Sequence, residues 1–558
     1  MKEAPWRTLA AVLLVGTLLF LWPERAGLLG DPIGETHNHL WYFAHAWAGL
    51  QADFPADWSL PLMDPPNLGW FALGWAWSPT AAWNLVAIGN VVLGGVGGAT
   101  LGWVLTRSRA GACVGLAAVA WSPFLGGAID FGVTEAEPLG WYALHLAAMV
   151  RLRDDPRPRV WLAAGATLGA FALTGWYHAA FALVPAAPLA LWVRRREALY
   201  AGGLALLMVL PSFLELLSHL AVWQDRAAGL SDPTRIRAWR IQERYGIDLL
   251  RFGPSTVRFT PSYSVYVGVG IVGLAAVAGR RGAAWAALAT PLYVLALGHW
   301  LRVGGEPVLL GGEALKLPAG RLVEAWPHAR FVTHWYRAAG PASVCMAAAA
   351  SLGAAAVERW CSERFFGPTA AVPPGAMSPA SSGPGAGRRW LLVAIGPLLA
   401  CVLLADSLAL SSTRWPRVAA PLPVPPALVL DGPVLDLPVD DNRVRPEQVG
   451  SRRPAWMWQL THRQPVTENY EGADTVLARS DQARALQRAC GGLPVPRPGA
   501  PDAGRVDPDS DGVGLRALGV RWVVVHHALA PVGCVEAVVT ALGAPTEGVE
   551  GATAWRLE

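Results

Sequence analysis

Near its start the chain reads Leu9-Ala-Ala-Val-Leu-Leu-Val-Gly-Thr-Leu-Leu-Phe-Leu-Trp22, an apolar run without a single charge. Runs long enough to span or nearly span a bilayer recur about eleven times along the sequence. The others cover approximately residues 81–105, 110–124, 139–150, 160–175, 179–193, 198–217, 263–279, 283–301, 338–357 and 390–410. Of the 558 residues, 53% are hydrophobic and 15% charged, with a mean hydropathy of +0.33. This composition predicts an α-helical polytopic membrane protein and excludes a soluble globule.

The orientation in the membrane follows from the arginines in the short connections between these runs. On one side the connections carry Arg107, Arg109, Arg151, Arg153, Arg157, Arg159, Arg194, Arg195, Arg196, Arg280, Arg281, Arg359, Arg364, Arg388 and Arg389. The positive-inside rule makes that side cytoplasmic. The first run lacks an A-x-A-like cleavage site and is expected to remain as an anchor. With an odd number of spans, the N-terminus is cytoplasmic and the C-terminal part is outside.

The sequence divides into a membrane domain, residues 1–410, and an extracytoplasmic α/β domain, residues 411–558. The predicted external loops are 23–80, 126–138, 218–262 and 302–337, and a cytoplasmic Pro/Gly/Ser/Ala linker, 367–387, is expected to be disordered. In the second domain, residues 427–431, 434–438, 520–526 and 553–557 are predicted as strands and 475–490 and 534–542 as helices. Strands and helices in this order predict a small mixed sheet.

The second domain contains the one pair of cysteines predicted to lie in the oxidising compartment, Cys490 and Cys534. A disulfide between them is the expectation. The alternative is two unpaired, buried thiols.

The first predicted external loop begins directly after the anchor with Asp31-Pro-Ile-Gly-Glu35-Thr-His37-Asn38-His39-Leu-Trp41. Acids held beside a bilayer are costly unless they bind or react with something, so Asp31 and Glu35 are the candidate catalytic residues. The proline after Asp31 favours a turn or extended backbone there, and a helix can begin near Glu35. The same loop later adds Asp53, Asp57 and Asp64.

His39 and Trp41 are candidate substrate-binding residues of this loop. Trp41 could stack on a sugar or a prenyl chain, or anchor the loop at the membrane interface. A permanent zinc site at these histidines is disfavoured, because no cysteine or second clear ligand group follows. A labile Mg²⁺ or Mn²⁺ held by Asp31, Glu35 and a substrate phosphate fits the residues better.

Two further loops carry charges on the same side. Asp130, Glu135 and Glu137 are predicted to lie in a short loop between spans, either as substrate-binding carboxylates or as ordinary solvated loop residues. Before the tenth span, Arg330 and Arg337 are candidates to grip a phosphate, since guanidinium groups bind phosphate well. Anchoring to lipid headgroups is the alternative for these arginines.

The whole pattern resembles the GT-C superfamily of integral membrane glycosyltransferases, in which a large first external loop bears an essential acid. Here Gly30-Asp31-Pro-Ile-Gly-Glu35 occupies the place of that motif, although its acids are not contiguous. The segment Arg330 to Ala339 resembles the approach to a late span in YfhO-like and related membrane proteins. The tails of many uncharacterised members are similar to the segments Val434 to Pro438, His462 to Pro465, Asn469 to Gly472 and Gly519 to His526. The resemblance implies a polyprenyl-phosphate sugar as donor and the bacterial inner membrane as location, with the C-terminal domain periplasmic or extracellular.

Three functions are compatible with these features. The leading one is transfer of a sugar from a polyprenyl-phosphate donor to an envelope glycan, lipid or protein on the external face. The second is a non-catalytic scaffold or assembly factor for envelope polysaccharide, and the third is a transporter. Paired inverted halves with broken helices, which would favour a transporter, are not seen in the sequence. The expected partners are the lipid bilayer and the lipid-linked sugar, with no nucleic acid.

Overall fold

The structure, a computed structural model, describes most of the predicted membrane domain and part of the C-terminal domain. The described residues are 6–23, 26–30, 36–48, 64–193, 196–229, 247–254, 265–326, 329, 332, 334–366, 386–411, 417, 419–420, 430–437, 480–490, 513–527, 530, 532–549 and 551–557. The predicted linker 367–387 therefore lies almost wholly outside them.

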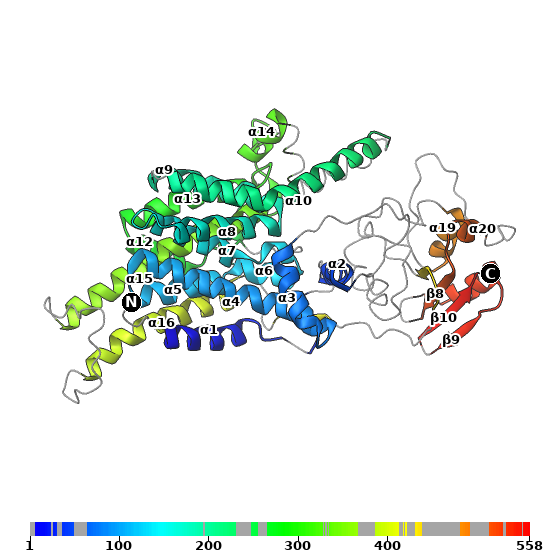
Figure 1. Ribbon diagram of the computed structural model, residues 1–558, viewed down its shortest axis with the longest axis horizontal. Helices are drawn as coiled ribbons and strands as arrows, with labels where there is room; N and C mark the ends of the chain where they lie inside the picture. Colours follow the sequence, from blue (N-terminus) through cyan, green and yellow to red (C-terminus); the bar gives the residue numbers. More distant parts are fainter. Residues whose placement is uncertain are drawn as a thin grey trace. The chain divides into compact units, whose positions relative to one another are not determined.

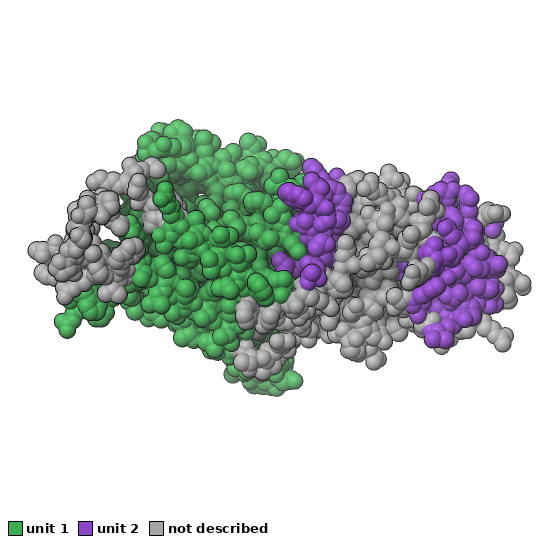
Figure 2. All heavy atoms as spheres, turned by 90° about the horizontal axis from the view of Figure 1, so that it is seen from below, with its two compact units in different colours: residues 1–25, 61–73, 84–418 green, residues 26–60, 74–83, 419–558 purple. Residues whose placement is uncertain are grey.

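The chain forms two compact units (Figure 2). Unit 1 comprises Met1–Arg25, Pro61–Leu73 and Asn84–Val418. Unit 2 comprises Ala26–Leu60, Gly74–Trp83 and Ala419–Glu558. Unit 2 thus combines the C-terminal part of the chain with two pieces from the first predicted loop and its edge.

Unit 1 is built almost entirely from helices (Figure 1). The α-helices whose residues lie wholly or mainly in it are α1 (Trp6–Phe20), α3 (Pro65–Trp75), α4 (Pro79–Thr106), α5 (Arg109–Ala120), α6 (Pro123–Phe131), α7 (Leu139–Leu152), α8 (Pro158–Thr174), α9 (Trp176–Val193), α10 (Arg196–Gly229), α12 (Val269–Val277), α13 (Arg280–Ala296), α14 (Pro318–Ala325), α15 (Ala339–Phe366) and α16 (Ala386–Leu410). Short 3-10 helices are η1 (Thr134–Ala136), η2 (Leu249–Phe252) and η4 (Trp335–Ala338). Helix α2 (Thr36–Ala48) belongs to unit 2.

Each apolar run predicted from the sequence contains a helix, so the multi-span helical fold is confirmed. Five described helical segments are long and apolar enough to cross a membrane: Pro79–Thr106, Arg109–Phe131, Arg196–Leu214, Trp335–Phe365 and Leu392–Leu410. The number of about eleven spans stays a prediction. Helix α10 runs on to Gly229, beyond residue 217 where the sequence placed the end of that span.

Helices α4 and α5 pack closely because glycines face each other along their contact. A Cβ added at Gly98 would lie 2.0 Å from the Gly115 carbonyl oxygen, and one at Gly102 would lie 2.2 Å from the Gly111 oxygen. The glycines are spaced four residues apart on both helices, which puts them on one face of each. Small residues at this spacing let helix backbones approach within a bilayer, where apolar burial alone does not favour association.

Asp406, an acidic residue within the apolar helix α16, forms hydrogen bonds at the start of α12. The Oδ2 atom of Asp406 accepts a hydrogen bond from the backbone N–H of Gly270 at 3.0 Å. Its Oδ1 atom accepts one from the Tyr266 hydroxyl at 2.6 Å. Asp406 therefore acts as a cap for α12 through Gly270, which lies 136 residues away in sequence.

Unit 2 contains the predicted mixed sheet, which is confirmed, with strand order β7-β8-β10-β9. Strands β7 (Val434–Leu437) and β8 (Trp522–His526) are parallel, while β10 (Ala552–Arg556) is antiparallel to β8 and to β9 (Glu547–Val549). The predicted helix 534–542 is α21 (Cys534–Leu542), and α19 (Asp481–Ala489) falls within the predicted helix 475–490. Helix α20 (Val513–Ala517) and strand β9 were not predicted, and residues 427–429 lie outside the described part.

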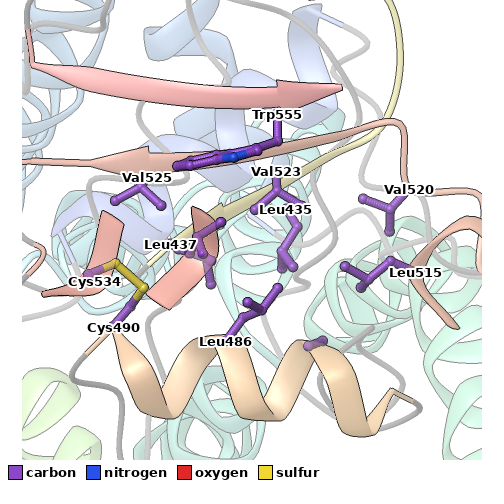
Figure 3. Close-up of a cluster of buried hydrophobic side chains, with 12 residues drawn as sticks. Leu435, Leu437, Leu486, Cys490, Leu515, Val520, Val523, Val525, Cys534 and Trp555 are labelled. Carbon is purple, nitrogen blue, oxygen red and sulfur yellow. A yellow bond between two sulfur atoms is a disulfide. The ribbon is translucent and has the colours of Figure 1, made fainter. Parts of the chain in front are cut away.

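The core of the sheet domain lies between β7, β8, β10 and helix α19 (Figure 3). Leu435, Val523 and Trp555 from the strands are fully or almost fully buried against Leu486 of α19. Cys490 and Cys534 complete this core and are joined by a disulfide. The bond connects the end of α19 to the beginning of α21 and closes a loop of 44 residues.

Thiol labelling of denatured, unreduced protein should miss Cys490 and Cys534. A native disulfide over a loop of this length contributes about 2–4 kcal/mol to stability, so Cys534→Ser should lower the unfolding midpoint of unit 2. Cys361→Ser is the matched control, because Cys361 is a free cysteine near the C-terminal end of α15. Labelling of both Cys490 and Cys534 before reduction would contradict the bond.

Candidate polar site in unit 1

The predicted catalytic acids, Asp31 and Glu35, lie outside the described residues, as does Arg330. Helix α2 begins at Thr36, directly after Glu35, where the sequence predicted a helix. His39 is partly buried on this helix, and the side chain of Trp41 is not among those described. The roles of these five residues stay predictions.

Of the two interpretations that the sequence left open for the second acidic segment, substrate binding or ordinary loop solvation, the structure bears on the second. Helix α6 continues through Asp130 to Phe131, so the loop begins only at Gly132. Asp130 and Glu137 are 1% and 2% exposed, and the interpretation as ordinary loop solvation is therefore wrong for both. The sequence determines this helix locally: Ser122 caps it, Pro123 occupies its first turn, and Gly132 ends it with φ 73°.

A chain of hydrogen bonds connects the first acidic loop to the second. The Asn67 side-chain amide donates to Asp64 Oδ2 and to the Thr134 carbonyl oxygen, both at 2.8 Å. The Asn90 amide donates to Asn67 Oδ1 at 2.8 Å and to Glu137 Oε2 at 3.0 Å. All four side chains are buried. Each amide thus uses both of its N–H groups, which fixes its orientation and holds α3, α4 and the Thr134–Glu137 segment together.

The backbone places Asp64 at the entry of α3. Its N–H donates to the Leu173 carbonyl oxygen at 3.1 Å, and its φ of 60° lies in the left-handed region, which Asp adopts more readily than most residues. Pro65 then starts α3, and Asn67 follows one turn later on the side that meets α4. The position of Asp64 next to Asn67 is therefore set by local backbone geometry as well as by the side chains.

Burial raises the pKa of the Glu137 carboxyl from its ordinary value of 4.5 to about 8, and the nearby Glu135 acts in the same direction. The hydrogen bond from Asn90 opposes this shift and is the weaker effect. At neutral pH Glu137 therefore holds its proton for most of the time and adds little negative charge to the cluster.

Replacing Glu137 with Gln should remove a pH dependence of stability. Because the folded protein binds this proton more tightly than the unfolded chain, the contribution is complete below the unfolded pKa and is lost as the pH rises through about 8. As the pH rises from about 5 to 9, we expect the unfolding midpoint of the wild type to decrease, and that of Glu137→Gln to decrease less. Glu306 is exposed, so Glu306→Gln should follow the wild-type profile, and equal slopes in all three proteins would contradict the assignment.

Glu135 and Arg337, both predicted as substrate-binding residues, contact each other. Arg337 Nη2 lies 2.6 Å from Glu135 Oε1, and the two side chains are 5% and 17% exposed. The guanidinium carbon also lies 5.2 Å from the centre of the Tyr177 ring and 5.9 Å from that of Tyr336. Helix η4 places Arg337 directly before α15, so the cation is held at the end of a membrane-crossing helix.

A second buried ion pair, Arg417 with Asp130, was not predicted. Arg417 Nη1 lies 3.0 Å from Asp130 Oδ2, and both residues are almost completely buried. The Nε–H donates to the Phe20 carbonyl oxygen at 2.9 Å, and the backbone N–H donates to the Trp22 oxygen at 2.7 Å. Arg417 thus ties the end of α1 to α6, the helix that leads into the Glu135–Glu137 segment.

Metal binding by the described residues has no support, since no group of three or more His, Cys, Asp or Glu among them is arranged to hold an ion. The predicted labile Mg²⁺ or Mn²⁺ concerns Asp31 and Glu35, which lie outside that part of the chain.

No family model and no curated protein matches the sequence. Several solved structures are similar. ArnT from Cupriavidus metallidurans bound to undecaprenyl phosphate is 14% identical, with 99% of this chain and 97% of that chain covered and a TM-score of 0.45. The oligosaccharyltransferase AglB from Archaeoglobus fulgidus is 11% identical, with 97% and 72% covered and a TM-score of 0.38. The mycobacterial arabinofuranosyltransferase AftD is 14% identical, with 98% and 38% covered and a TM-score of 0.46.

Two of these proteins are named as transferases, an oligosaccharyltransferase and an arabinofuranosyltransferase. At such low identities and TM-scores, the likeness concerns the general architecture and carries nothing about substrate or reaction.

Proposed function

We propose that this protein is a membrane glycosyltransferase that moves a sugar from a polyprenyl-phosphate donor to an envelope acceptor on the external face. The observation that supports this most is the polar cluster of unit 1. It gathers carboxyls from two predicted external loops, Asp64, Glu135 and Glu137, beside the buried Arg337. Acids and a buried cation that meet next to membrane-crossing helices are costly to keep unless they serve a site.

The proposed reaction is an inverting transfer. The acceptor hydroxyl oxygen forms a bond to the anomeric carbon, the bond from that carbon to the phosphate oxygen breaks, and polyprenyl phosphate leaves with the electron pair. A carboxylate must take the hydroxyl proton, and a cation must stabilise the departing phosphate. We assign the first role to Asp31 or Glu35 and the second to Arg337 and Arg330.

The described residues support these roles in two ways. Glu137 holds a proton at neutral pH and so does not repel an incoming phosphate. The Asn67–Asn90 pair keeps the Thr134–Glu137 segment in place, and that segment presents Glu135 to Arg337. His39 and Trp41 are assigned to the sugar, and a Mg²⁺ or Mn²⁺ at Asp31 and Glu35 would add charge on the phosphate. The membrane is proposed to be the bacterial inner membrane, with the C-terminal domain outside.

The test is turnover by the purified full chain in lipid nanodiscs with a panel of radiolabelled polyprenyl-phosphate sugars and an envelope extract as acceptor. We expect one donor to release polyprenyl phosphate and to label the acceptor. Donor binding without turnover in every case would indicate the scaffold function instead. Uptake of the labelled compound by reconstituted vesicles, without bond cleavage, would indicate a transporter.

A further inference from the structure

The segment between α13 and η4 forms two consecutive β-hairpins. Strand β2 (Arg302–Val303) pairs with β3 (Glu306–Pro307), and β4 (Leu309–Leu310) pairs with β5 (Glu313–Ala314). Both turns are Gly-Gly, with φ of 67° and 90° in the first and 64° and 87° in the second. Positive φ at both turn positions is the requirement of a type I′ turn, which glycine meets without strain.

Backbone hydrogen bonds join the two hairpins into one small sheet. The Val308 N–H donates to the Leu301 oxygen at 2.8 Å, and the Leu315 N–H donates to the Val308 oxygen at 2.8 Å. The Leu301 N–H completes this ring of bonds by donating to the Leu315 oxygen at 3.0 Å. The sheet is therefore ordered by its own backbone, and the turn of its second hairpin begins at Gly311, three residues after Val308.

The tip of the second hairpin is apolar and exposed. Leu309 and Leu310 are 62% and 72% exposed, although adjacent residues of a strand point to opposite faces. Helix α14, at the periphery of unit 1 (Figure 1), adds Leu322 and is followed by Trp326, which are 41% and 56% exposed. Large apolar side chains are thus exposed on both faces of this hairpin.

We propose that the tip of the second hairpin, Leu309 and Leu310, and the exposed side chains of α14 insert into the lipid interface of the leaflet where α15 begins. Chain connectivity supports this occupant. The sheet starts at Leu301, five residues after α13 ends at Ala296, and α14 is followed by the crossing segment Trp335–Phe365. Both ends of the segment are thus attached to apolar helices, which keeps the hairpins beside the bilayer.

The side chains around the tip have the chemistry of a membrane interface. Trp300 and Trp326 flank the segment, and Lys316 Nζ lies 5.2 Å from the Trp300 ring centre. Tryptophan and long cationic side chains are enriched where headgroups meet hydrocarbon, because each has an apolar body and a polar end.

Charge limits how deep the tip can go and which lipid it needs. Residues 297–326 contain three basic and three acidic residues, so attraction to anionic lipid does not drive insertion. Glu313 lies directly opposite Leu310 in the hairpin register. Since a carboxylate is costly in hydrocarbon, the insertion stops at the boundary between headgroups and acyl chains.

The test places an environment-sensitive dye at the tip of the full chain in nanodiscs. The variant is Leu310→Cys in a background with Cys361→Ser and Cys401→Ser, which removes the two free cysteines that are not buried. We expect a blue-shifted emission, loss of intensity with lipids spin-labelled near the headgroup, and little quenching by aqueous iodide. Phosphatidylcholine alone and its mixture with phosphatidylglycerol should give the same result.

The matched control is Val532→Cys in the same background, since Val532 is fully exposed in a turn of unit 2. Its dye should be quenched by iodide. Iodide quenching at position 310 would overturn the proposal, and so would shielding from both quenchers, which would indicate a protein partner or a second copy. As a second measurement, Leu309→Ser with Leu310→Ser should reduce lipid quenching of a dye at Leu322→Cys, and unchanged quenching there would also count against it.

Discussion

Replacing Arg417 with Met should destabilise unit 1 by about 3–5 kcal/mol, because it leaves the buried Asp130 carboxylate without its cation. The same change removes the Nε–H bond to the Phe20 oxygen and the bond from Nη1 to the Gly126 oxygen. Met is close to Arg in volume, so the loss reports charge and hydrogen bonds more than an empty space. Unfolding in mixed detergent and dodecyl sulfate micelles, followed by circular dichroism, measures it.

The double variant Arg417→Met with Asp130→Leu separates the ion pair from the packing. Removing both charges at once leaves no uncompensated carboxylate, and such replacements are often neutral or stabilising. We therefore expect the double variant to be more stable than Arg417→Met alone. The ion pair of Arg157 with Asp155 provides the control, since the Arg157 side chain is 60% exposed, and Arg157→Met should leave the midpoint unchanged. If the double variant were less stable than Arg417→Met alone, the stabilisation by Arg417 would not come from its ion pair with Asp130.

Under the proposed function, Asp31→Asn should lower turnover by about 10²–10⁴, the usual effect of removing a general base. Glu35 stands directly before α2, where a carboxylate interacts favourably with the helix N-terminus, so it has a structural role available. The proline after Asp31 keeps that residue out of the helix and leaves it freer for chemistry. We therefore expect Asp31→Asn to be more damaging than Glu35→Gln when both are compared at matched expression.

Turnover of labelled donor at saturating concentration is the measurement for both variants, and Glu306→Gln is the control with an exposed carboxylate. Full activity in both Asp31→Asn and Glu35→Gln would move the catalytic acid elsewhere. Glu135 would then be the next candidate, since Glu137 holds its proton at neutral pH and is a poor base.

Elements with a strong local pattern were predicted well from the sequence. Helix α21 covers the predicted residues because its apolar spacing and flanking glycines are all local signals. Strand β8 lies within its predicted range because of its run of valines. Strand β9, Glu547–Val549, has no such pattern and exists because it pairs with β10. The Gly-Gly pairs at 304–305 and 311–312 are a clear sequence signal for hairpins. Because only the charged residues of this loop were considered, the hairpins were not predicted.

The candidate site was only partly predictable. The sequence singled out Glu135, Glu137 and Arg337 from their charges, but their surroundings depend on residues far away along the chain. Glu137 is held by Asn90, 47 residues away, and Asp130 is buried because Arg417, 287 residues away, neutralises it. Neither an isolated Asn in an apolar helix nor a single Arg after a span carries a local signal for such a role.

The pairing of β1 (Leu28–Leu29) with β6 (Ala419–Ala420) has a consequence for biosynthesis. At about 5–20 residues per second, a ribosome needs roughly 20–80 s to make the roughly 390 residues between these strands. During this time the backbone groups of β1 have no β6 to pair with, so they must form hydrogen bonds with water or with other groups. A chain stopped before Ala419 can therefore never close this ladder.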